Sequence, residues 1–493
     1  MPAGVPQGSP LSPLLFMYYN ADLLEVPSTK RDMALGFIDD IVYGTSGPTA
    51  QGNVTKLKRL LNKAEEWRQK HGAKFEESKY VLIHFTRNRH KATTASISTN
   101  GVIVKPSAEA KYLGVIFDKE LRFKTHVQYA VKKGTKAALA LGSIGKSTWG
   151  APYQCIRQLF QATVATRMDY GTIIWHRPKA DGSTASSNQA RKFTTVQRLA
   201  MKATTGCYRT TPTVAMELES GTQPAWLRLQ TKVLSAMARM RSLHSKHPLK
   251  RWIAKAKKAT ELNKKIVHLS NLENILSQFP LLTQDIEEVI PWKPPDQSTP
   301  SSKPTKKAIQ AEVRKLADSK WNELWQAGDK PGNKTAPHLR RIVKDDLTQG
   351  RTLYSSVQQR SDCAILTQLR TGHCGLNSYL FRFNKAESAE CPHCGYAKET
   401  VEHFLLECPV YWEERHVLRV KAGATKMTLS GLLGDKDVVS ATLEYVRNTR
   451  RFSEEGGERR QFEGGNQMEL EGQFGQTRNE DGELHGDERQ IEG

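Results

Sequence analysis

The stretch GFIDDIVYG, residues 36–44, sets Asp39 and Asp40 side by side between apolar residues that favour β-strands. Neighbouring side chains of a regular strand face opposite ways, so both carboxylates reach one site only at the tip of a hairpin. Carboxylates presented in this way bind Mg²⁺, which in two-metal sites holds the attacking and the leaving oxygen of a phosphoryl transfer. Pairs of aspartates are also common in exposed turns that bind nothing, so this pair alone leaves both interpretations open.

A bent segment precedes the two aspartates: GVPQGSPLSPLLF, residues 4–16, which runs into an apolar stretch. Its glycines permit close approach of the backbone to a ligand, and Gln7 and Ser9 offer hydrogen bonds there. The other interpretation is an ordinary Pro/Gly loop, capped by Ser12 before a helix.

In this order, the two stretches resemble the reverse transcriptases of non-LTR (LINE-like) retrotransposons. The first is similar to that family's template- and nucleotide-positioning segment, and FIDD at residues 37–40 is similar to its catalytic hairpin. WRQKHGAKFEESKYVLIHF, residues 67–85, resembles the next element of the polymerase palm, and KYLGVIFD, residues 111–118, resembles the primer-grip hairpin.

The resemblance implies roles for individual residues. Asp39 and Asp40 would be catalytic Mg²⁺ ligands, with Asp39 the more direct ligand. The nucleotide- and template-binding residues would be Gln7, Gly8, Ser9, Phe37 and Lys79. The implied activity is RNA-directed DNA polymerisation by target-primed reverse transcription, which uses an RNA template, a DNA primer or target, and deoxynucleotides.

A departure from the family concerns a further metal-binding aspartate, which the family's palm takes from a strand well upstream of the Pro-Gln-Gly segment. Only residues 1–3 precede that segment here, and Asp22, Glu25 and Asp32 follow it. We therefore expect a polymerase truncated at its N-terminus and inactive alone, from a gene model that begins too late or a broken element. The alternative is a non-catalytic nucleic-acid-binding remnant with a zinc finger.

The stretch CPHCGYAKETVEHFLLEC, residues 391–408, supplies Cys391, Cys394, His403 and Cys408 in a C-x2-C-x8-H-x4-C spacing. Thiolates and an imidazole at such intervals suit a closed tetrahedral Zn²⁺ site, which lets a small segment fold without much core. The spacing also resembles the C-terminal CCHC finger of the same retroelements.

The lead-in to this motif, RTGHCGLNSYLFRF at residues 370–383, combines basic residues with Tyr379, Phe381 and Phe383. These rings either stack on nucleic-acid bases or pack against the finger. The remaining cysteines have no motif partners and are expected in the core: Cys155, Cys207, Cys363 and Cys374.

Composition supports an anionic partner. The 493 residues carry 73 Lys and Arg against 51 Asp and Glu, a net charge of +22. Such an excess favours nucleic acid, although a merely basic soluble enzyme stays open. No stretch approaches the ~18 apolar residues of a membrane helix, and no export signal opens the chain. We expect an intracellular protein without membrane contact, in the nucleus during integration and in the cytoplasm when it binds RNA.

The predicted fold class is α+β: a partial reverse-transcriptase palm with antiparallel hairpins, then a mainly helical region and a small zinc finger. Apolar residues at helical spacing over residues 54–67 predict a helix that Gly72 ends, and Asn100-Gly101 predicts a hairpin turn. Residues 81–85 and 112–118 are predicted as strands. The predicted divisions are a palm (1–120), a thumb or connection region (121–290), a linker (291–307), a basic helical segment (308–385), the finger (386–450) and a disordered acidic tail (453–493).

Overall fold

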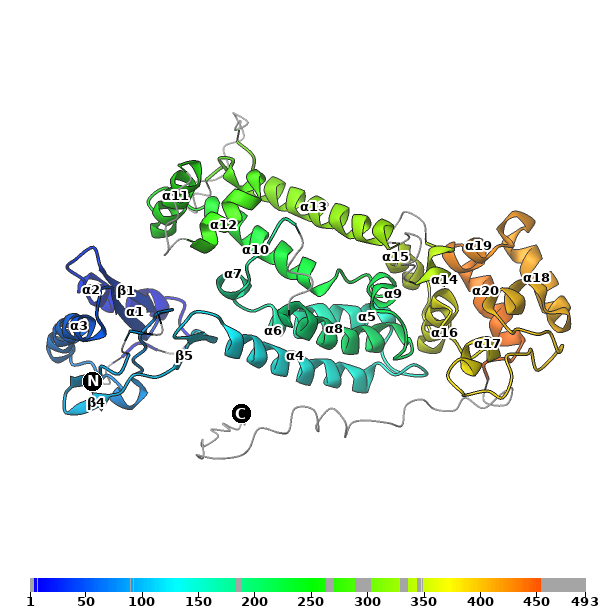
Figure 1. The fold of residues 1–493 in the computed structure, drawn as a ribbon, viewed down its shortest axis with the longest axis horizontal. Coiled ribbons are helices and arrows are strands. Elements are labelled where there is room, and N and C mark those ends of the chain that lie inside the picture. Colours follow the sequence, from blue (N-terminus) through cyan, green and yellow to red (C-terminus); the bar gives the residue numbers. More distant parts are fainter. Residues whose placement is uncertain are drawn as a thin grey trace. The chain divides into compact units, whose positions relative to one another are not determined.

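The computed structural model describes residues 4–6, 8–88, 90–91, 93–181, 188–262, 270–288, 303–328, 336–343, 347 and 349–453. Gln7 and nearly all of the predicted tail lie outside the described residues. The chain forms two compact units (Figure 1). The first contains residues 1–337 and 345–367, and the second contains residues 338–344 and 368–493.

The described residues among the first 118 form three α-helices and three two-stranded antiparallel sheets, which confirms the mixed composition and the hairpins predicted for this part. The elements are α1 (Ser12–Tyr19), α2 (Ala21–Glu25), β1 (Asp32–Phe37), β2 (Asp40–Thr45), α3 (Ala50–His71), β3 (Ile97–Thr99), β4 (Val102–Val104), β5 (Glu109–Tyr112) and β6 (Val115–Asp118).

Helix α3 forms where the apolar period predicts it. The Thr49 side chain accepts a hydrogen bond from the Gly52 amide and caps the first turn, and Gly72, at φ +61°, ends the helix in the left-handed conformation. On the buried face of α3, Ala64 and Trp67 form a small core with Leu23. Ile41 and Tyr43 of β2 pack against that core, so α3 supports one face of the β1–β2 hairpin.

Two of the predicted strands differ in the structure. Residues 81–85 form only an isolated bridge from Leu82 to Pro106, so this strand prediction was wrong. Residues 112–118 do not form one strand: Leu113 and Gly114, at φ +45° and +79°, turn the chain between β5 and β6. Positive φ at both central residues is the hairpin turn whose twist matches its strands. The hairpin implied by the family resemblance is therefore correct, and the single strand was wrong.

The region after residue 122 is helical, as predicted. It contains α4 (Lys124–Ile144), α5 (Tyr153–Leu159), a π-helical stretch (Phe160–Ala165), α6 (Thr166–Met168), α7 (Thr172–Trp175), α8 (Asn188–Thr205), α9 (Thr213–Glu219), α10 (Ala225–Arg241), α11 (Pro248–Glu261), α12 (Ser270–Gln278) and α13 (Lys306–Ala327). Helices α4 and α8 lie side by side (Figure 1), and their core includes Val127, Ala138, Phe193 and Ala200.

Helix α13 begins at Lys306, within the stretch that the sequence predicts as a linker (291–307), of which residues 291–302 lie outside the described part. Ile309 and Val313 of α13 share one core with Val233 of α10, and α13 runs along α10 (Figure 1). The first unit therefore continues on both sides of that stretch. The predicted domain boundaries themselves stay a prediction.

The Arg360 side chain binds the C-terminal ends of two helices, α4 and α8. It is 5% exposed, and its guanidinium donates hydrogen bonds to the carbonyl oxygens of Lys146, Thr204, Ala203 and Gly145. These four carbonyls lie at or just beyond the C-terminal ends of α4 and α8, where helices leave acceptors without intrahelical partners. One buried cation thus satisfies both helix ends.

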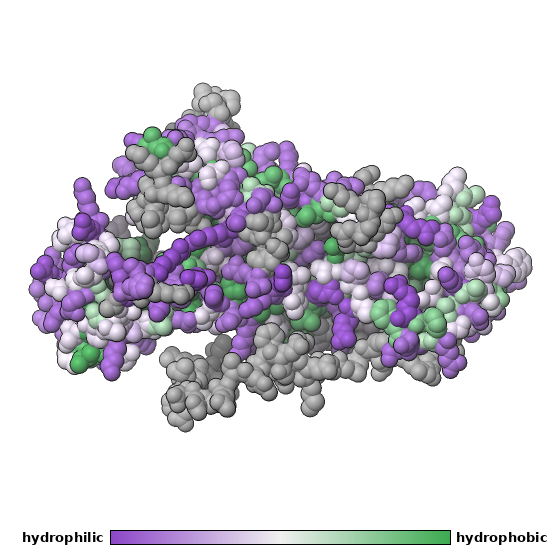
Figure 2. All heavy atoms as spheres, viewed as in Figure 1, coloured by the Kyte–Doolittle hydropathy of each residue, from purple (hydrophilic) through white to green (hydrophobic). Residues whose placement is uncertain are grey.

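The remaining elements are α14 (Pro337–Arg340), α15 (Gln349–Ser355), α16 (Arg360–Thr371), α17 (Asn377–Phe381), α18 (Trp412–Ala422), α19 (Leu429–Gly434) and α20 (Val439–Asn448). Among the described residues, none of the helices combines the length and hydrophobicity needed to cross a bilayer. Hydrophilic side chains cover most of the described surface on the face drawn in Figure 2.

Candidate polymerase hairpin and metal centre

The β1–β2 hairpin presents the two aspartates at its tip, as predicted. Phe37 pairs with Asp40, and Ile38 and Asp39 form the turn between them. Ile38 has φ +55°, a conformation that β-branched residues rarely adopt. The Asn20 side chain, just after α1, donates a hydrogen bond of 3.0 Å to the Ile38 carbonyl. The helix that follows the Pro-Gln-Gly segment therefore fixes the turn that carries Asp39.

Both carboxylates are exposed, and the Phe37 ring is 55% exposed. Within the described part of the chain, no group of three or more Cys, His, Asp or Glu side chains includes them. Asp32 is no substitute, because it pairs with Thr45 at the other end of the hairpin, roughly 17 Å along the strand. Its carboxylate instead accepts hydrogen bonds from Thr29 and Thr45.

The β5–β6 hairpin lies near this tip. Burial raises the pKa of Tyr112, at the end of β5, and the negative charge of Asp40 raises it further. The turn of this hairpin is held from the helical body: the Tyr170 hydroxyl donates a hydrogen bond of 2.9 Å to the Leu113 carbonyl. His126 of α4 accepts a hydrogen bond of 3.3 Å from the Ile116 amide. The helical body therefore positions the hairpin whose Tyr112 is influenced by the charge of Asp40.

The other predicted nucleotide-site residues occupy two loops. Gly8 has φ +91°, which favours glycine, and the Ser9 hydroxyl accepts a hydrogen bond from the Leu11 amide. Ser12 donates to the Pro6 carbonyl, so the segment folds back on itself before α1. Lys79 ends a 3-10 turn (Glu77–Lys79), is exposed, and has Glu76 as a charged neighbour.

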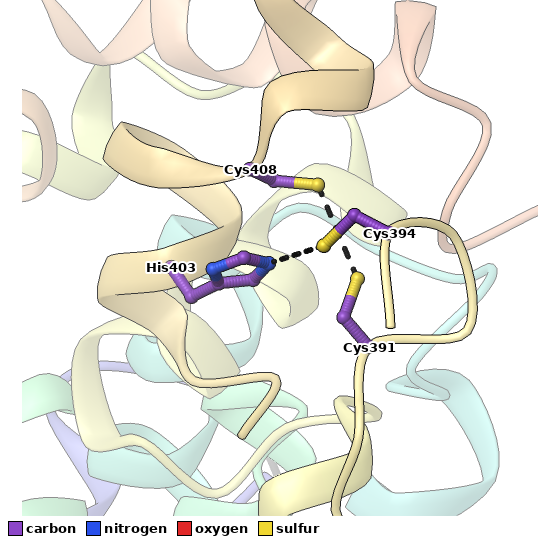
Figure 3. Close-up of side chains that lie close together, drawn as sticks. All are labelled: Cys391, Cys394, His403 and Cys408. Carbon is purple, nitrogen blue, oxygen red and sulfur yellow. Dashed lines mark hydrogen bonds between the residues drawn. The ribbon is translucent and has the colours of Figure 1, made fainter. Parts of the chain in front are cut away.

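The predicted zinc ligands come together in the second unit. The ligand atoms of Cys391, Cys394, His403 and Cys408 all lie within 4.8 Å of one another, and the side chains point toward a common centre (Figure 3). The Cys391 and Cys408 sulfurs are 4.0 Å apart, and the Cys394 sulfur is 3.3 Å from His403 Nε2. A zinc tetrahedron with bonds of about 2.0–2.3 Å has edges of roughly 3.5–3.8 Å. The geometry and the donor set therefore fit Zn²⁺.

The local backbone explains how the four ligands meet. The first two belong to a loop in which the Gly395 amide donates to the Cys391 carbonyl, and Gly395 has φ +70°. His403 starts a π-helical turn (His403–Glu407), which brings Cys408 back to the loop. The Tyr396 ring stacks on the His403 ring with centroids 4.7 Å apart.

The second nitrogen of His403 completes the fit. His403 Nδ1 is buried and has no hydrogen-bond partner among the described residues, and the Glu407 carboxylate lies 3.7 Å away. Zinc-bound histidines usually donate their outer N–H to such a carboxylate, which fixes the tautomer. Burial also raises the pKa of the Cys408 thiol to about 11, a cost that coordination of the thiolate by a metal ion would offset.

Contacts from later helices hold this centre. Arg415 of α18 donates to the carbonyls of Leu405 and Cys408, and the Tyr445 hydroxyl of α20 donates to the Phe404 carbonyl at 2.6 Å. Further along, Arg451 forms a buried ion pair with Glu399, which also accepts from the Asn377 amide. The centre is therefore part of the core of this unit.

The aromatic residues of the lead-in to the zinc motif, residues 370–383, could either pack against the finger or stack on nucleic-acid bases, and they differ in exposure. Tyr379 is 8% exposed and contacts the rings of His373 and Phe383, so it packs. Phe381 and Phe383 are 47% and 43% exposed. Of the unmatched cysteines, Cys207, Cys363 and Cys374 are buried as expected, whereas Cys155 is exposed.

Sequence reasoning missed Asn20, Tyr170 and Glu407. Asn20 and Tyr170 act on turns 18 and 57 residues away in the chain, and neither belongs to a motif. Glu407 lies inside the CCHC spacing, four residues after His403. That i, i+4 spacing on a helix is the signal that could have found it.

Comparison with known proteins supports the resemblance. The reverse transcriptase (RNA-dependent DNA polymerase) family matches residues 2–117. The chain is 29% identical over 212 residues to the "Probable RNA-directed DNA polymerase from transposon BS" of Drosophila melanogaster, covering 42% of this chain and 23% of that protein. It is 22% identical over 440 residues to the "Putative 115 kDa protein in type-1 retrotransposable element R1DM" of the same organism, covering 88% and 36%.

A third relative aligns over most of both chains. It is the "Retrovirus-related Pol polyprotein from type-1 retrotransposable element R1 2" of Nasonia vitripennis, 24% identical over 426 residues, covering 84% of this chain and 87% of that one. The chain thus spans about a quarter to a third of the first two relatives. The predicted resemblance to non-LTR retrotransposon reverse transcriptases is confirmed.

Proposed function

We propose, from the reverse-transcriptase match over residues 2–117, that this chain belongs to the machinery of RNA-directed DNA synthesis in a non-LTR retrotransposon. The observation that carries the proposal is the Asp39 turn, a two-residue hairpin tip that presents two exposed carboxylates. Its partners would be an RNA template, a DNA primer or target, and deoxynucleotides. We propose that it acts in the nucleus during integration and binds RNA in the cytoplasm.

The Asp39 and Asp40 carboxylates would hold Mg²⁺, which supplies charge stabilisation for the attacking and leaving oxygens of phosphoryl transfer. The protein's own part is to fix the turn, through Asn20 and α1, and to place the β5–β6 hairpin next to it, through Tyr170. Both aspartates come from one turn, and the described residues add no third acidic group there. We therefore propose that this chain alone extends primers poorly or not at all.

The second candidate function is nucleic-acid binding without chemistry. The lack of a third acidic group at the Asp39 turn, among the described residues, favours this candidate. The Cys391–Cys394–His403–Cys408 centre, whose proposed metal is Zn²⁺, favours it as well. In this candidate the CCHC centre is a structural element that holds a binding surface in shape.

The two candidates differ in whether the Asp39 turn binds a divalent metal. In the polymerase, Mn²⁺, a paramagnetic substitute for Mg²⁺, should broaden the methyl NMR signals of Ile38 and Ile41. Asp39→Asn should remove this broadening, whereas Asp32→Asn, at the other end of the same hairpin, should leave it. If Mn²⁺ does not broaden these signals in the parent chain, or still broadens them in Asp39→Asn, the result favours the second candidate, nucleic-acid binding without chemistry.

A primer-extension assay on an RNA template then tests catalysis by the chain itself. Little or no extension is expected. Extension that survives in Asp32→Asn and disappears in Asp39→Asn would support the polymerase site and contradict the proposed weakness of the isolated chain. Extension that survives in both variants would refute the role of Asp39.

A further inference from the structure

The basic side chains of helix α11 are of two kinds, those with an acidic neighbour in the fold and those without one among the described residues. Its apolar face, Ile253, Ala256 and Ala259, is buried, and Ala256 shares a core with α10 and α12. Lys250 and Lys257 lie 3.4 and 3.7 Å from acidic oxygens of Glu288 and Asp285. These two lysines therefore have acidic neighbours within the fold.

Three other cations of α11 have no such partner. Arg251, Lys255 and Lys258 are exposed, and no acidic side chain of the described residues lies within 4.0 Å of them. Their spacing of four and three residues puts them on one face, over about 10 Å of helix axis.

An aromatic ring accompanies these cations. Trp252 is 42% exposed, and the Lys255 ammonium lies 5.3 Å from the centre of its ring. Exposed aromatic rings among cations form the stacking platforms of proteins that bind single-stranded nucleic acid, because every base has a π-face. Exposed lysines on a helix are ordinary. An exposed indole among cations that the fold leaves unneutralised is a more specific arrangement.

We propose that the face of α11 formed by Arg251, Lys255 and Lys258, with the Trp252 ring at its edge beside Lys255, binds a single-stranded segment of nucleic acid outside the Asp39 turn. An anionic membrane is the other polyanion to consider. A helix that binds a bilayer surface inserts its apolar face, and the apolar face of α11 is already buried in the core. The observations therefore favour nucleic acid.

The test compares two double variants of the full chain that remove the same charge from the same helix. Binding of a labelled single-stranded RNA is measured by fluorescence anisotropy across a salt series. Arg251→Gln/Lys255→Gln should weaken binding at low salt and flatten the slope of log affinity against log salt by about 1.4, since each phosphate contact on a single strand contributes about 0.7. Lys250→Gln/Lys257→Gln should leave the slope near the parental value.

Two further arms address the ring and the kind of polyanion. Trp252→Leu should weaken RNA binding about tenfold, and Trp252→Phe should retain most of the affinity. Vesicles rich in phosphatidylserine should bind the parent and the Arg251→Gln/Lys255→Gln variant equally. Circular dichroism melts verify that every variant is folded.

The proposal is overturned if the two double variants change the salt slope equally, since net charge would then explain binding. It is also overturned if the ring substitutions have no effect, or if vesicle binding falls more than RNA binding. These outcomes are independent of Mn²⁺ binding at the Asp39 turn, so failure here is distinct from failure of the polymerase proposal.

Discussion

Cys394→Ser in the full chain should strongly weaken the binding of one Zn²⁺ ion per molecule. Cys394 is the best ligand to change because it is only half-buried, whereas Cys391 and Cys408 are 2% and 0% exposed. A serine hydroxyl at position 394 can bind water, so the substitution removes a ligand without burying an unsatisfied polar group.

The size of the effect follows from the ligand set. Structural Zn²⁺ sites contribute about 10–16 kcal/mol in finger peptides, which divides over four ligands to roughly 2.5–4 kcal/mol each. Loss of one thiolate should therefore weaken zinc binding by about 10²- to 10³-fold. Competition with a chromogenic chelator at neutral pH measures this ratio directly.

The matched control is Cys155→Ser, which changes an exposed thiol outside the cluster and should leave zinc content and affinity at parental values. Chelation should open the CCHC segment to proteolysis and leave the helical body folded, because the main helical cores contain none of the ligands. The ligand assignment is refuted if both variants lose zinc equally, and the site is refuted if the parent binds none.

Three further predictions concern single side chains. Glu407→Gln, which weakens the carboxylate beside His403 Nδ1, should lower zinc affinity by at most about 10–100-fold in the same competition assay; no change would remove it from the metal site. Tyr170→Phe deletes the hydrogen bond to the Leu113 carbonyl, which is worth about 1 kcal/mol, so hydrogen exchange of the β5 and β6 amides should accelerate roughly fivefold. Unchanged exchange would contradict the role of Tyr170 in positioning this hairpin. Burial raises the pKa of Glu217 from 4.5 to about 8, so between these pH values the folded chain keeps a proton that the unfolded chain releases, and the free energy of unfolding should fall as pH rises from 4.5 to 8. Glu217→Gln should flatten this fall in denaturant titrations, and an equally steep fall in the variant would show that other groups cause it.

Short-range signals account for the parts of the fold and site that could be predicted. Asn100 and Gly101 adopt positive φ, at +46° and +79°, and these two residue types are the ones that such a two-residue turn favours. The Asp39 turn and the CCHC cluster are predictable for the same reason, because each is built within 18 residues or fewer. Their residue types and spacing carry the geometry.

Partners distant in sequence account for what could not be predicted. The run at residues 81–85 has the composition of a strand, yet Val81 and Phe85 are 59% and 51% exposed and only Leu82 is buried. A strand needs a neighbour with matching hydrogen bonds, and nothing in the run says whether one exists. Tyr170 likewise gains its role only from the turn it meets, and no local pattern marks it.

The hydrogen bonds that Arg360 makes with the ends of α4 and α8 can form only late in the synthesis of the chain. Its guanidinium follows the carbonyls it binds by 156–215 residues. At a synthesis rate of about 5–20 residues per second, the ribosome delivers Arg360 roughly 10–40 s after α4 and α8 have emerged. Until then water must satisfy both helix ends. A copy of the chain that stops before residue 360 contains every residue of α4 and α8 and still lacks the cation that joins them.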